Sequence, residues 1–285
     1  MAESPMPESE LASFIRRNVS ESLDEDIQTG DLSAQLISGK LVSTAQIITR
    51  QQSVLCGTQW VNECFRILDP GCTIDWLTKD GDRISAGQTL CEIQGRARAL
   101  LSAERCALNW LQTLSGTATR TRRYVDAVAG IDVKIMDTRK TLPGLRHAQK
   151  YAVRIGGGHN QRIGLFDGIL IKENHIAAAG GIKPVLEQAY RLAKPGISVQ
   201  IEVENLAQLD EALSAGAKLI LLDNFDLDDL RTAVRTTGNR AELEASGGIT
   251  LDDLREIALT GVGRISIGSL TKDVQTIDLS MRINL

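Results

Sequence analysis

The chain has 285 residues, of which 42% are apolar, so it is long enough for a barrel together with a smaller companion domain. Its net charge of -4 gives no general attraction to nucleic acid or membranes, and its aromatic content of 4% disfavours a surface that stacks single-stranded bases. No run approaches the roughly 20 apolar residues that a membrane-spanning helix needs, so we expect neither nucleic acid nor membrane as a partner.

The start of the chain and its cysteines indicate a cytoplasmic protein. Residues 1–10 are acidic and contain proline, unlike the basic and apolar start of a secretion signal. The five cysteines precede residue 110 and include no Cys-x-x-Cys pair. We therefore expect buried free thiols in a reducing compartment.

The first part of the chain predicts a small α/β domain. An amphipathic helix is expected over residues 9–22, followed by short strands over residues 41–49, 72–77 and 89–93. The turn-rich residues 79–88 resemble the hammerhead of lipoyl and biotinyl carrier domains, but no acceptor lysine occupies the corresponding place. We expect a shared fold without the carrier function.

Several residues are predicted to begin or interrupt helices. A long helix is expected from Ser102 to about Val128, capped by Ser102. Gly116 predicts a bend or break in this helix and marks the domain boundary. Asp226 and Thr250 are expected to cap two later helices.

In the second half of the chain, short β-branched runs recur every twenty-odd residues and end in polar residues. These runs lie at residues 133–136, 168–171, 199–201, 219–222, 243–245 and 265–267. Strands that alternate with helical segments indicate a parallel sheet covered on both faces, and polar residues at strand C-termini are typical of an α/β barrel. We expect an N-terminal α/β sandwich over residues 1–115, joined by the tail 273–285, and a TIM-like barrel of six or seven parallel strands over residues 116–272.

Small residues follow the last two predicted strands, where barrels commonly bind phosphate. Ser246, Gly247 and Gly248 follow one strand, and Gly268 and Ser269 follow the next. Glycines let backbone N–H groups approach phosphate oxygens. The alternative is that these glycines only end helices.

Two carboxylates, Glu202 and Asp223, are expected one strand apart at the same rim. They suit Mg²⁺ held jointly with substrate phosphate, or hydrogen bonds to ribose hydroxyls. Either role places negative charge near a developing cationic sugar carbon. The alternative is a structural ion pair with Lys140 or Lys172.

The opposite charge is concentrated between residues 96 and 172, which hold 14 Lys or Arg against 5 Asp or Glu. Arg139, Lys140, Arg162 and Lys172 would bring part of this charge to the strand ends. The arginine guanidinium can donate two parallel hydrogen bonds to a planar carboxylate, so these four side chains suit a small substrate with two carboxylates. The three histidines are too scattered to predict a metal site.

Together these motifs resemble those of the quinolinate phosphoribosyltransferases, also called carboxylating nicotinate-nucleotide pyrophosphorylases, over nearly the whole chain. The matching segments are residues 104–109, 114–119, 137–144, 156–158 with 162, 170–175, 202–204, 223–224, 244–248 and 268–269. The resemblance implies an enzyme of NAD biosynthesis that joins quinolinate to phosphoribosyl pyrophosphate with Mg²⁺. The products would be nicotinate mononucleotide, pyrophosphate and CO₂.

The resemblance also implies an open barrel and a homodimer with shared active sites, which could assemble further. Arg105, Lys140, Glu202 and Asp223 would be catalytic, with Arg105 reaching the neighbouring subunit's site and both carboxylates serving the metal through substrate phosphates. The implied substrate-binding residues are Arg105, Thr138, Arg139, Lys140, Gln161, Arg162, Lys172, Glu202, Asp223, Ser246, Gly247, Gly248, Gly268, Ser269 and Lys272.

Two positions depart from the family pattern. Many members have histidine where this chain has Gln161, with His159 two residues earlier; Gln161 could still donate a hydrogen bond to a substrate carboxylate. Members also often have histidine in place of Lys272, where lysine could contact phosphate equally well.

Three alternatives stay open. A Schiff-base aldolase would use Lys140 or Lys172 at a barrel rim with a phosphate site. A molybdenum-associated relative could share the fold, and a non-catalytic protein could sense phosphoribosyl pyrophosphate. The number of arginines disfavours the aldolase, and the set Arg105, Lys140, Glu202 and Asp223 disfavours a degenerate site.

Overall fold

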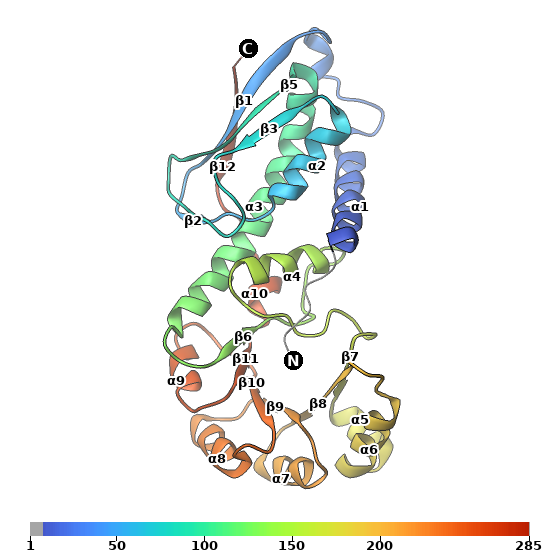
Figure 1. The fold of residues 1–285 in the computed structure, drawn as a ribbon, viewed down its shortest axis with the longest axis vertical. Coiled ribbons are helices and arrows are strands. Elements are labelled where there is room, and N and C mark those ends of the chain that lie inside the picture. The colour runs from blue at the N-terminus through green and yellow to red at the C-terminus, as the bar shows by residue number, and fades with distance from the viewer. Residues whose placement is uncertain (1–7, 285) are drawn as a thin grey trace. The chain divides into compact units, whose positions relative to one another are not determined.

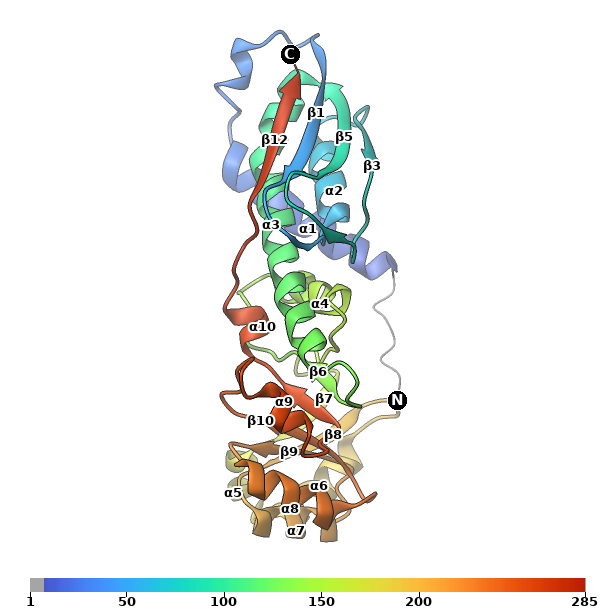
Figure 2. The ribbon, with the colours of Figure 1, turned by 90° about the vertical axis from the view of Figure 1, so that its left-hand side faces the viewer.

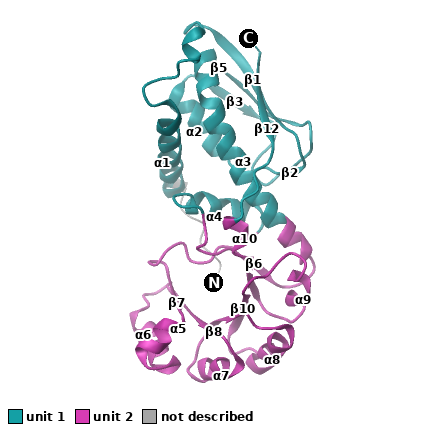
Figure 3. Ribbon diagram, turned by 180° about the vertical axis from the view of Figure 1, so that it is seen from behind, with its two compact units in different colours: residues 1–122, 142–157, 273–285 teal, residues 123–141, 158–272 magenta. Residues whose placement is uncertain are grey.

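The computed structural model of the chain describes residues 8–284, which form two compact units (Figure 3). Unit 1 contains Met1–Arg122, Leu142–Gly157 and Asp273–Leu285, and unit 2 contains Arg123–Thr141 and Gly158–Lys272. The predicted barrel domain extends without interruption from residue 116 to residue 272, whereas these units group 142–157 with unit 1. The predicted domain boundaries stay predictions. Most of the acidic start, residues 1–7, lies outside the described part of the chain.

Unit 1 has a two-layer α/β architecture, with an antiparallel sheet on one side of its helices (Figures 1 and 2). The strand order is β12-β1-β5-β3, and a separate pair joins β2 to β4. The elements are α1 (Glu8–Ile27), η1 (Ala34–Leu36), β1 (Val42–Thr49), β2 (Ser53–Val54), α2 (Thr58–Leu68), β3 (Thr73–Trp76), β4 (Arg83–Ile84), β5 (Thr89–Arg96), α3 (Ala97–Ala127), α4 (Arg146–Ile155) and β12 (Leu279–Asn284). The predicted N-terminal α/β sandwich is therefore confirmed.

Aromatic packing fills the interior of unit 1. Trp60 on α2 is fully buried, and its ring centroid lies 6.1 Å from that of Trp110 and 5.4 Å from that of Tyr151. Burial of such large side chains is the main source of stability in a small domain. All five cysteines are free, as predicted, and only Cys72 is partly exposed.

Helix α3 differs from the prediction at both its start and its middle. It begins at Ala97 rather than at Ser102, and the Ser102 hydroxyl donates instead to Asp31, at 2.7 Å. The predicted cap was therefore wrong. The helix also continues through Gly116 without a break.

Glycine is needed at position 116 because the chain returning toward β12 passes directly over it. A Cβ atom there would overlap the carbonyl oxygen of Gln275 and lie 3.0 Å from its carbonyl carbon. From the sequence alone, a glycine that allows close packing cannot be distinguished from a glycine that breaks a helix. The difference comes from a segment about 160 residues further along the chain.

Unit 2 is a curved parallel sheet with helices on its outer side (Figure 3). Its six strands within the described residues have the order β6-β11-β10-β9-β8-β7, and β6 and β7 stand at the two open edges. The elements are β6 (Lys134–Met136), β7 (Gly168–Ile171), α5 (Glu173–Ala179), α6 (Ile182–Leu192), β8 (Ser198–Val203), α7 (Leu206–Ser214), β9 (Leu219–Asp223), α8 (Leu227–Thr237), β10 (Glu242–Ser246), α9 (Leu254–Ala258), β11 (Arg264–Ser266) and α10 (Ser269–Lys272). The prediction of an open TIM-like barrel of six or seven strands is confirmed.

The free edge of β6 is partly covered by the segment that precedes β7. The His159 N–H donates to the Ile135 carbonyl at 2.8 Å, and the His159 carbonyl accepts from the Asp137 N–H at 2.9 Å. This short parallel bridge brings the next residues of the segment to the inner side of the barrel.

Asp226 and Thr250 in unit 2 were predicted to cap helices, and the structure confirms one of these two caps. Asp226 caps α8 by accepting a hydrogen bond from the Asp229 N–H at 2.8 Å. Thr250 instead bonds the Asp253 carboxylate at 2.6 Å, and α9 begins only at Leu254. The predicted Thr250 cap was therefore wrong. No helix among residues 8–284 has both the length and the apolar character that a membrane crossing requires.

Candidate active site

Unit 2 collects every predicted substrate-binding residue except Arg105. The C-terminal ends of parallel strands meet at one rim of a barrel, so side chains that follow β6, β7, β8, β9, β10 and β11 converge there. Arg105 lies on α3 in unit 1, where its side chain is exposed. Arg105 is therefore the one predicted substrate-binding residue that lies outside the barrel unit.

Two arginines of the predicted cationic set, Arg139 and Arg162, lie near each other in the barrel. Burial lowers the pKa of the Arg162 guanidinium, the nearby charge of Arg139 lowers it further, and Asp167 opposes the shift. The Arg162 guanidinium donates to the Gly168 carbonyl at 2.9 Å, and a Cβ at Gly168 would lie 3.1 Å from the Arg162 Cβ. An anion bound beside Arg162 would favour its charged form and so offset the burial and the nearby positive charge.

Lys140 is held next to the end of β11. Its backbone N–H donates to the Thr138 hydroxyl at 3.0 Å, and its carbonyl accepts from the Thr271 hydroxyl at 2.7 Å. A Cβ at Gly268 would lie 3.2 Å from Lys140 Cδ, so the lysine stem passes over this glycine. The ammonium group is therefore carried toward the predicted phosphate region, while Lys272 stays exposed at the end of α10.

The turn after β10 requires its first glycine. Gly247 has φ 108°, and a Cβ there would overlap the side-chain oxygen of Asn224. Asn224 has φ 58°, donates its N–H to the Ser246 carbonyl at 2.9 Å, and donates its amide to Asp223 at 2.9 Å. The turns after β9 and β10 are thus interlocked, and this contact orients the Asp223 carboxylate.

The glycines farther along the rim leave the backbone accessible. Gly248 has φ 57°, and a Cβ there would meet no atom within 4 Å. Ser269 lies at the start of the four-residue α10, and its hydroxyl is 3.5 Å from the Tyr124 hydroxyl. Such open backbone is what close approach to phosphate oxygens requires.

Glu202 forms an ion pair with Lys172. The lysine Nζ lies 2.7 and 2.9 Å from the two carboxylate oxygens, and the Glu202 side chain is only 12% exposed. The alternative of a structural ion pair with Lys172 is thus realised at this carboxylate. An ion pair does not exclude a role in binding, because an anionic substrate could compete for the ammonium group.

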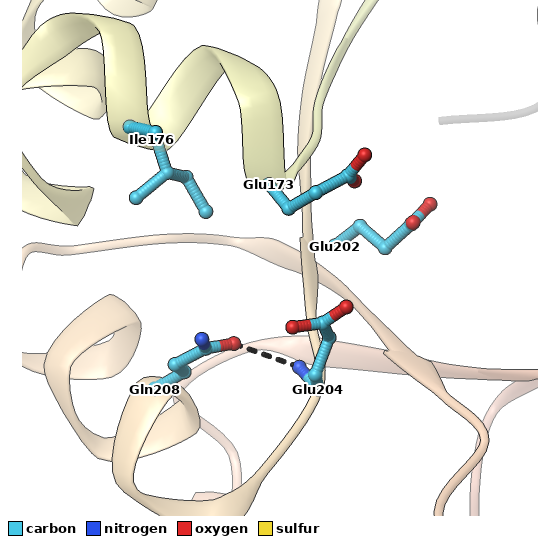
Figure 4. A pocket seen from close by; sticks show the side chains of 6 residues that line it. Glu173, Ile176, Glu202, Glu204 and Gln208 are labelled. Atoms are coloured by element: carbon cyan, nitrogen blue, oxygen red, sulfur yellow. Dashed lines mark hydrogen bonds between the residues drawn. The ribbon is translucent and has the colours of Figure 1, made fainter.

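An acidic pocket adjoins this ion pair (Figure 4). It encloses about 150 Å³ and is lined by Glu173, Ile176, Ala177, Glu202, Glu204 and Gln208. Gln208 accepts a hydrogen bond from the Glu204 N–H at 2.8 Å. Three carboxylates in one pocket disfavour a diacid there, so the arginine side of the rim is the better place for one. No group of three or more His, Cys, Asp or Glu side chains within residues 8–284 could hold a metal by itself.

Each of the three histidines makes a structural contact. His175 Nδ1 accepts from the Lys172 N–H at 3.0 Å and helps to begin α5 beside the ion pair. His159 contacts β6 through its backbone. His147, in unit 1, stacks on Phe14 with ring centroids 3.6 Å apart.

A buried polar layer, which was not among the predicted features, lies beneath the rim. Glu244 on β10 is 1% exposed and accepts hydrogen bonds from Gln161, Gln200 and Ser266. The signal was present as a carboxylate inside an apolar strand, two residues before Ser246 on the same face. The Gln161 amide nitrogen points to Glu244, so donation to a substrate carboxylate would have to replace that bond.

Family models match most of the chain. The model described as the C-terminal domain of quinolinate phosphoribosyl transferase matches residues 117–282, and the model of its N-terminal domain matches residues 29–115.

Individual proteins show the same similarity over nearly the full length. A probable carboxylating nicotinate-nucleotide pyrophosphorylase of Bacillus subtilis is 44% identical over 92% of this chain and 90% of its own length. The corresponding protein of Mycobacterium leprae is 41% identical over 93% of this chain and 96% of its own length. A solved structure of the nicotinate-nucleotide pyrophosphorylase from Francisella tularensis has a TM-score of 0.93, with 45% identity over 96% of this chain and 97% of that one. These names do not favour the aldolase or the molybdenum-associated alternative.

Proposed function

The chain belongs to the quinolinate phosphoribosyltransferase family, and from this membership we propose how the rim of its barrel performs the reaction. It is an enzyme of NAD biosynthesis that transfers the phosphoribosyl group of phosphoribosyl pyrophosphate to the ring nitrogen of quinolinate. Decarboxylation then gives nicotinate mononucleotide. The pyridine nitrogen already has a lone pair, so the reaction needs no nucleophilic serine or cysteine.

The observation that carries the assignment of residues is the proximity of Arg139 and Arg162. Burial lowers the pKa of Arg162 and the charge of Arg139 lowers it further, and a substrate with two carboxylates would offset both effects. Lys172 would add a third positive charge. We assign the quinolinate carboxylates to these three side chains.

The phosphoribosyl half would occupy the other arc of the rim. Lys140 would bind its anionic oxygens, together with the turn over residues 246–248 and Gly268, Ser269 and Lys272. Glu202 and Asp223 would hold Mg²⁺ through substrate phosphates, since two carboxylates on neighbouring strands fit the usual protein share of such a site. Mg²⁺ would neutralise charge on the departing pyrophosphate. The two carboxylates would also favour positive charge on the sugar carbon as its bond to pyrophosphate breaks.

We further propose a cytoplasmic homodimer in which Arg105 completes the site of the neighbouring subunit. Support comes from the family pattern and from the position of Arg105, which is exposed on α3 in unit 1. The predicted role of Gln161 is limited by its bond to Glu244.

The first test is product formation with Mg²⁺ and phosphoribosyl pyrophosphate, using quinolinate and nicotinate in parallel. Nicotinate mononucleotide and CO₂ from quinolinate, without turnover of nicotinate, are expected. Turnover of nicotinate would contradict the two-carboxylate site, and turnover of neither would contradict the proposed function.

Complementation tests the shared site. Arg105→Ala and Lys140→Ala should each abolish most turnover while leaving the fold intact. After the two variants are mixed and re-equilibrated, about a quarter of wild-type activity should return, because half of the dimers are mixed and each mixed dimer has one intact site. No recovery in demonstrably mixed dimers would show that Arg105 acts within its own subunit.

A further inference from the structure

The barrel contains a second polar layer directly below the proposed substrate-binding layer. Three of its members each lie two residues before a rim residue on the same strand face. The pairs are Gln200 with Glu202, Glu244 with Ser246, and Ser266 with Gly268. Two residues of a parallel strand rise about 6.6 Å, so this layer forms the floor of the site.

Glu244 is the centre of this floor. Both of its carboxylate oxygens lie 2.5 Å from the Gln161 amide nitrogen, and one lies 3.0 Å from the Gln200 amide nitrogen. The Ser266 hydroxyl also donates to it. The donors therefore come from β8, from β11 and from the segment before β7, so one side chain ties together opposite parts of the barrel.

The contacts of Glu244 are unusual for a buried carboxylate, because all three of its described donors are neutral. A carboxyl group that is 1% exposed must be satisfied by hydrogen bonds, and here two amides and a hydroxyl supply them. Both Glu244 oxygens face the Gln161 amide nitrogen and act as its acceptors, so this contact determines which end of the Gln161 amide faces the floor.

The backbone at Gln161 is held independently from the other side. Asp137, which is fully buried, accepts the Gln161 N–H at 2.8 Å and the Asn160 side-chain amide at 2.6 Å. The next residue along the chain is Arg162, whose guanidinium donates to the Gly168 carbonyl at the start of β7. Two buried carboxylates thus fix the residue immediately before this arginine, one through its main chain and one through its side chain.

We infer that Glu244 is a positioning residue for quinolinate binding, which holds Gln161 down on the barrel floor and so sets the placement of Arg162. This inference rests on the assignment of Arg162 to the quinolinate carboxylates. Because Glu244 acts from below, it touches no substrate. It is expected to affect the affinity for the diacid much more than the affinity for phosphoribosyl pyrophosphate.

Glu244→Gln is the direct test, because it keeps the size of the side chain and replaces one acceptor oxygen with a donor. One of the three donors to Glu244 would then face another donor. The KM for quinolinate should rise about tenfold, which corresponds to the loss of one well-placed hydrogen bond. The KM for phosphoribosyl pyrophosphate should change less than about twofold.

Glu242→Gln is the matched control. Glu242 lies on the same strand and face, two residues further from the rim, and bonds Arg264 at 2.6 Å and Lys134 at 3.5 Å. This variant makes the same substitution on the same strand without touching Gln161. It should lose some stability and leave both KM values unchanged.

A second pair of variants makes the result independent of any one substitution. Glu244→Asp keeps the charge but shortens the side chain by one methylene, so it should also raise the quinolinate KM if Glu244→Gln does not fold. Gln161→Met removes the partner. If both residues act through one contact, the Glu244→Gln, Gln161→Met double variant should be no worse than the poorer single variant.

Three outcomes would overturn the inference. They are an unchanged quinolinate KM in folded Glu244 variants, an equal rise in both KM values, and full additivity in the double variant. Calorimetric titration of quinolinate measures the same effect without turnover. Absence of turnover in the wild type would refute the proposed function, whereas equal quinolinate Kd values in wild type and Glu244→Gln would refute the positioning role alone.

Discussion

Replacing Gly116 by alanine is expected to destabilise the protein, although alanine is the better helix former. In the interior of a helix, glycine to alanine ordinarily stabilises by about 1 kcal/mol. Here the added Cβ would overlap the carbonyl oxygen of Gln275 and lie 3.0 Å from its carbonyl carbon and 3.2 Å from the Cα of Thr276. The two effects have opposite signs, so the sign of the measured change decides between them.

The steric effect should dominate because the atoms that must move belong to backbone. Overpacking by one methyl group usually costs about 1–3 kcal/mol, and a main chain relaxes less readily than the end of a side chain. The segment concerned leads into β12, whose six residues pair with β1. A shift there would disturb the edge of the sheet, so we expect a net loss of about 1–2 kcal/mol after the helix gain is subtracted.

Urea denaturation followed by far-ultraviolet circular dichroism measures this change. Gly39→Ala is the control, because a Cβ there would lie no closer than 3.6 Å to its nearest neighbour, Arg98. The control should stay within about 0.5 kcal/mol of wild type. A Gly116→Ala variant as stable as wild type, or more stable, would refute the close approach of residues 275–276 to α3.

Two further predictions concern acidic residues of unit 2, Asp226 and Glu242. Asp226→Ala removes the side chain that caps α8 and should lower the free energy of unfolding by about 1 kcal/mol in urea denaturation; Asp226→Asn, which keeps an acceptor, should restore most of it. The hydrogen bond from Arg264 holds the pKa of Glu242 below 4.5, with further contributions from the charges of Arg264 and Lys134. Since the folded pKa is depressed, this stabilisation of about 1 kcal/mol is present above pH 4.5 and is lost as the pH falls through the folded pKa. The stability difference between wild type and Glu242→Gln should therefore shrink between pH 6 and pH 3, and a constant difference would contradict the ion pair.

The sequence alone determined the barrel and the location of most candidate residues. Short runs of three or four mostly apolar residues that end in polar side chains specify buried parallel strands, and the C-termini of such strands must meet at one edge. That rule predicts, without any coordinates, that Lys140, Glu202 and Asp223 follow strands whose ends lie at one edge. The motifs around these residues also identified the family.

Only the tertiary structure decided the roles of residues whose partners are distant in the chain. Gly116 resembles a helix breaker until residue 275 is placed against it, and Glu244 resembles an ordinary strand residue until Gln161 and Gln200 converge on it. The cap at Ser102 failed because α3 already begins at Ala97, so Ser102 lies inside the helix and its hydroxyl donates to the distant Asp31. Local patterns specify what each segment forms, but contacts between distant segments decide which atoms meet, because packing and buried hydrogen bonds are satisfied across the whole fold.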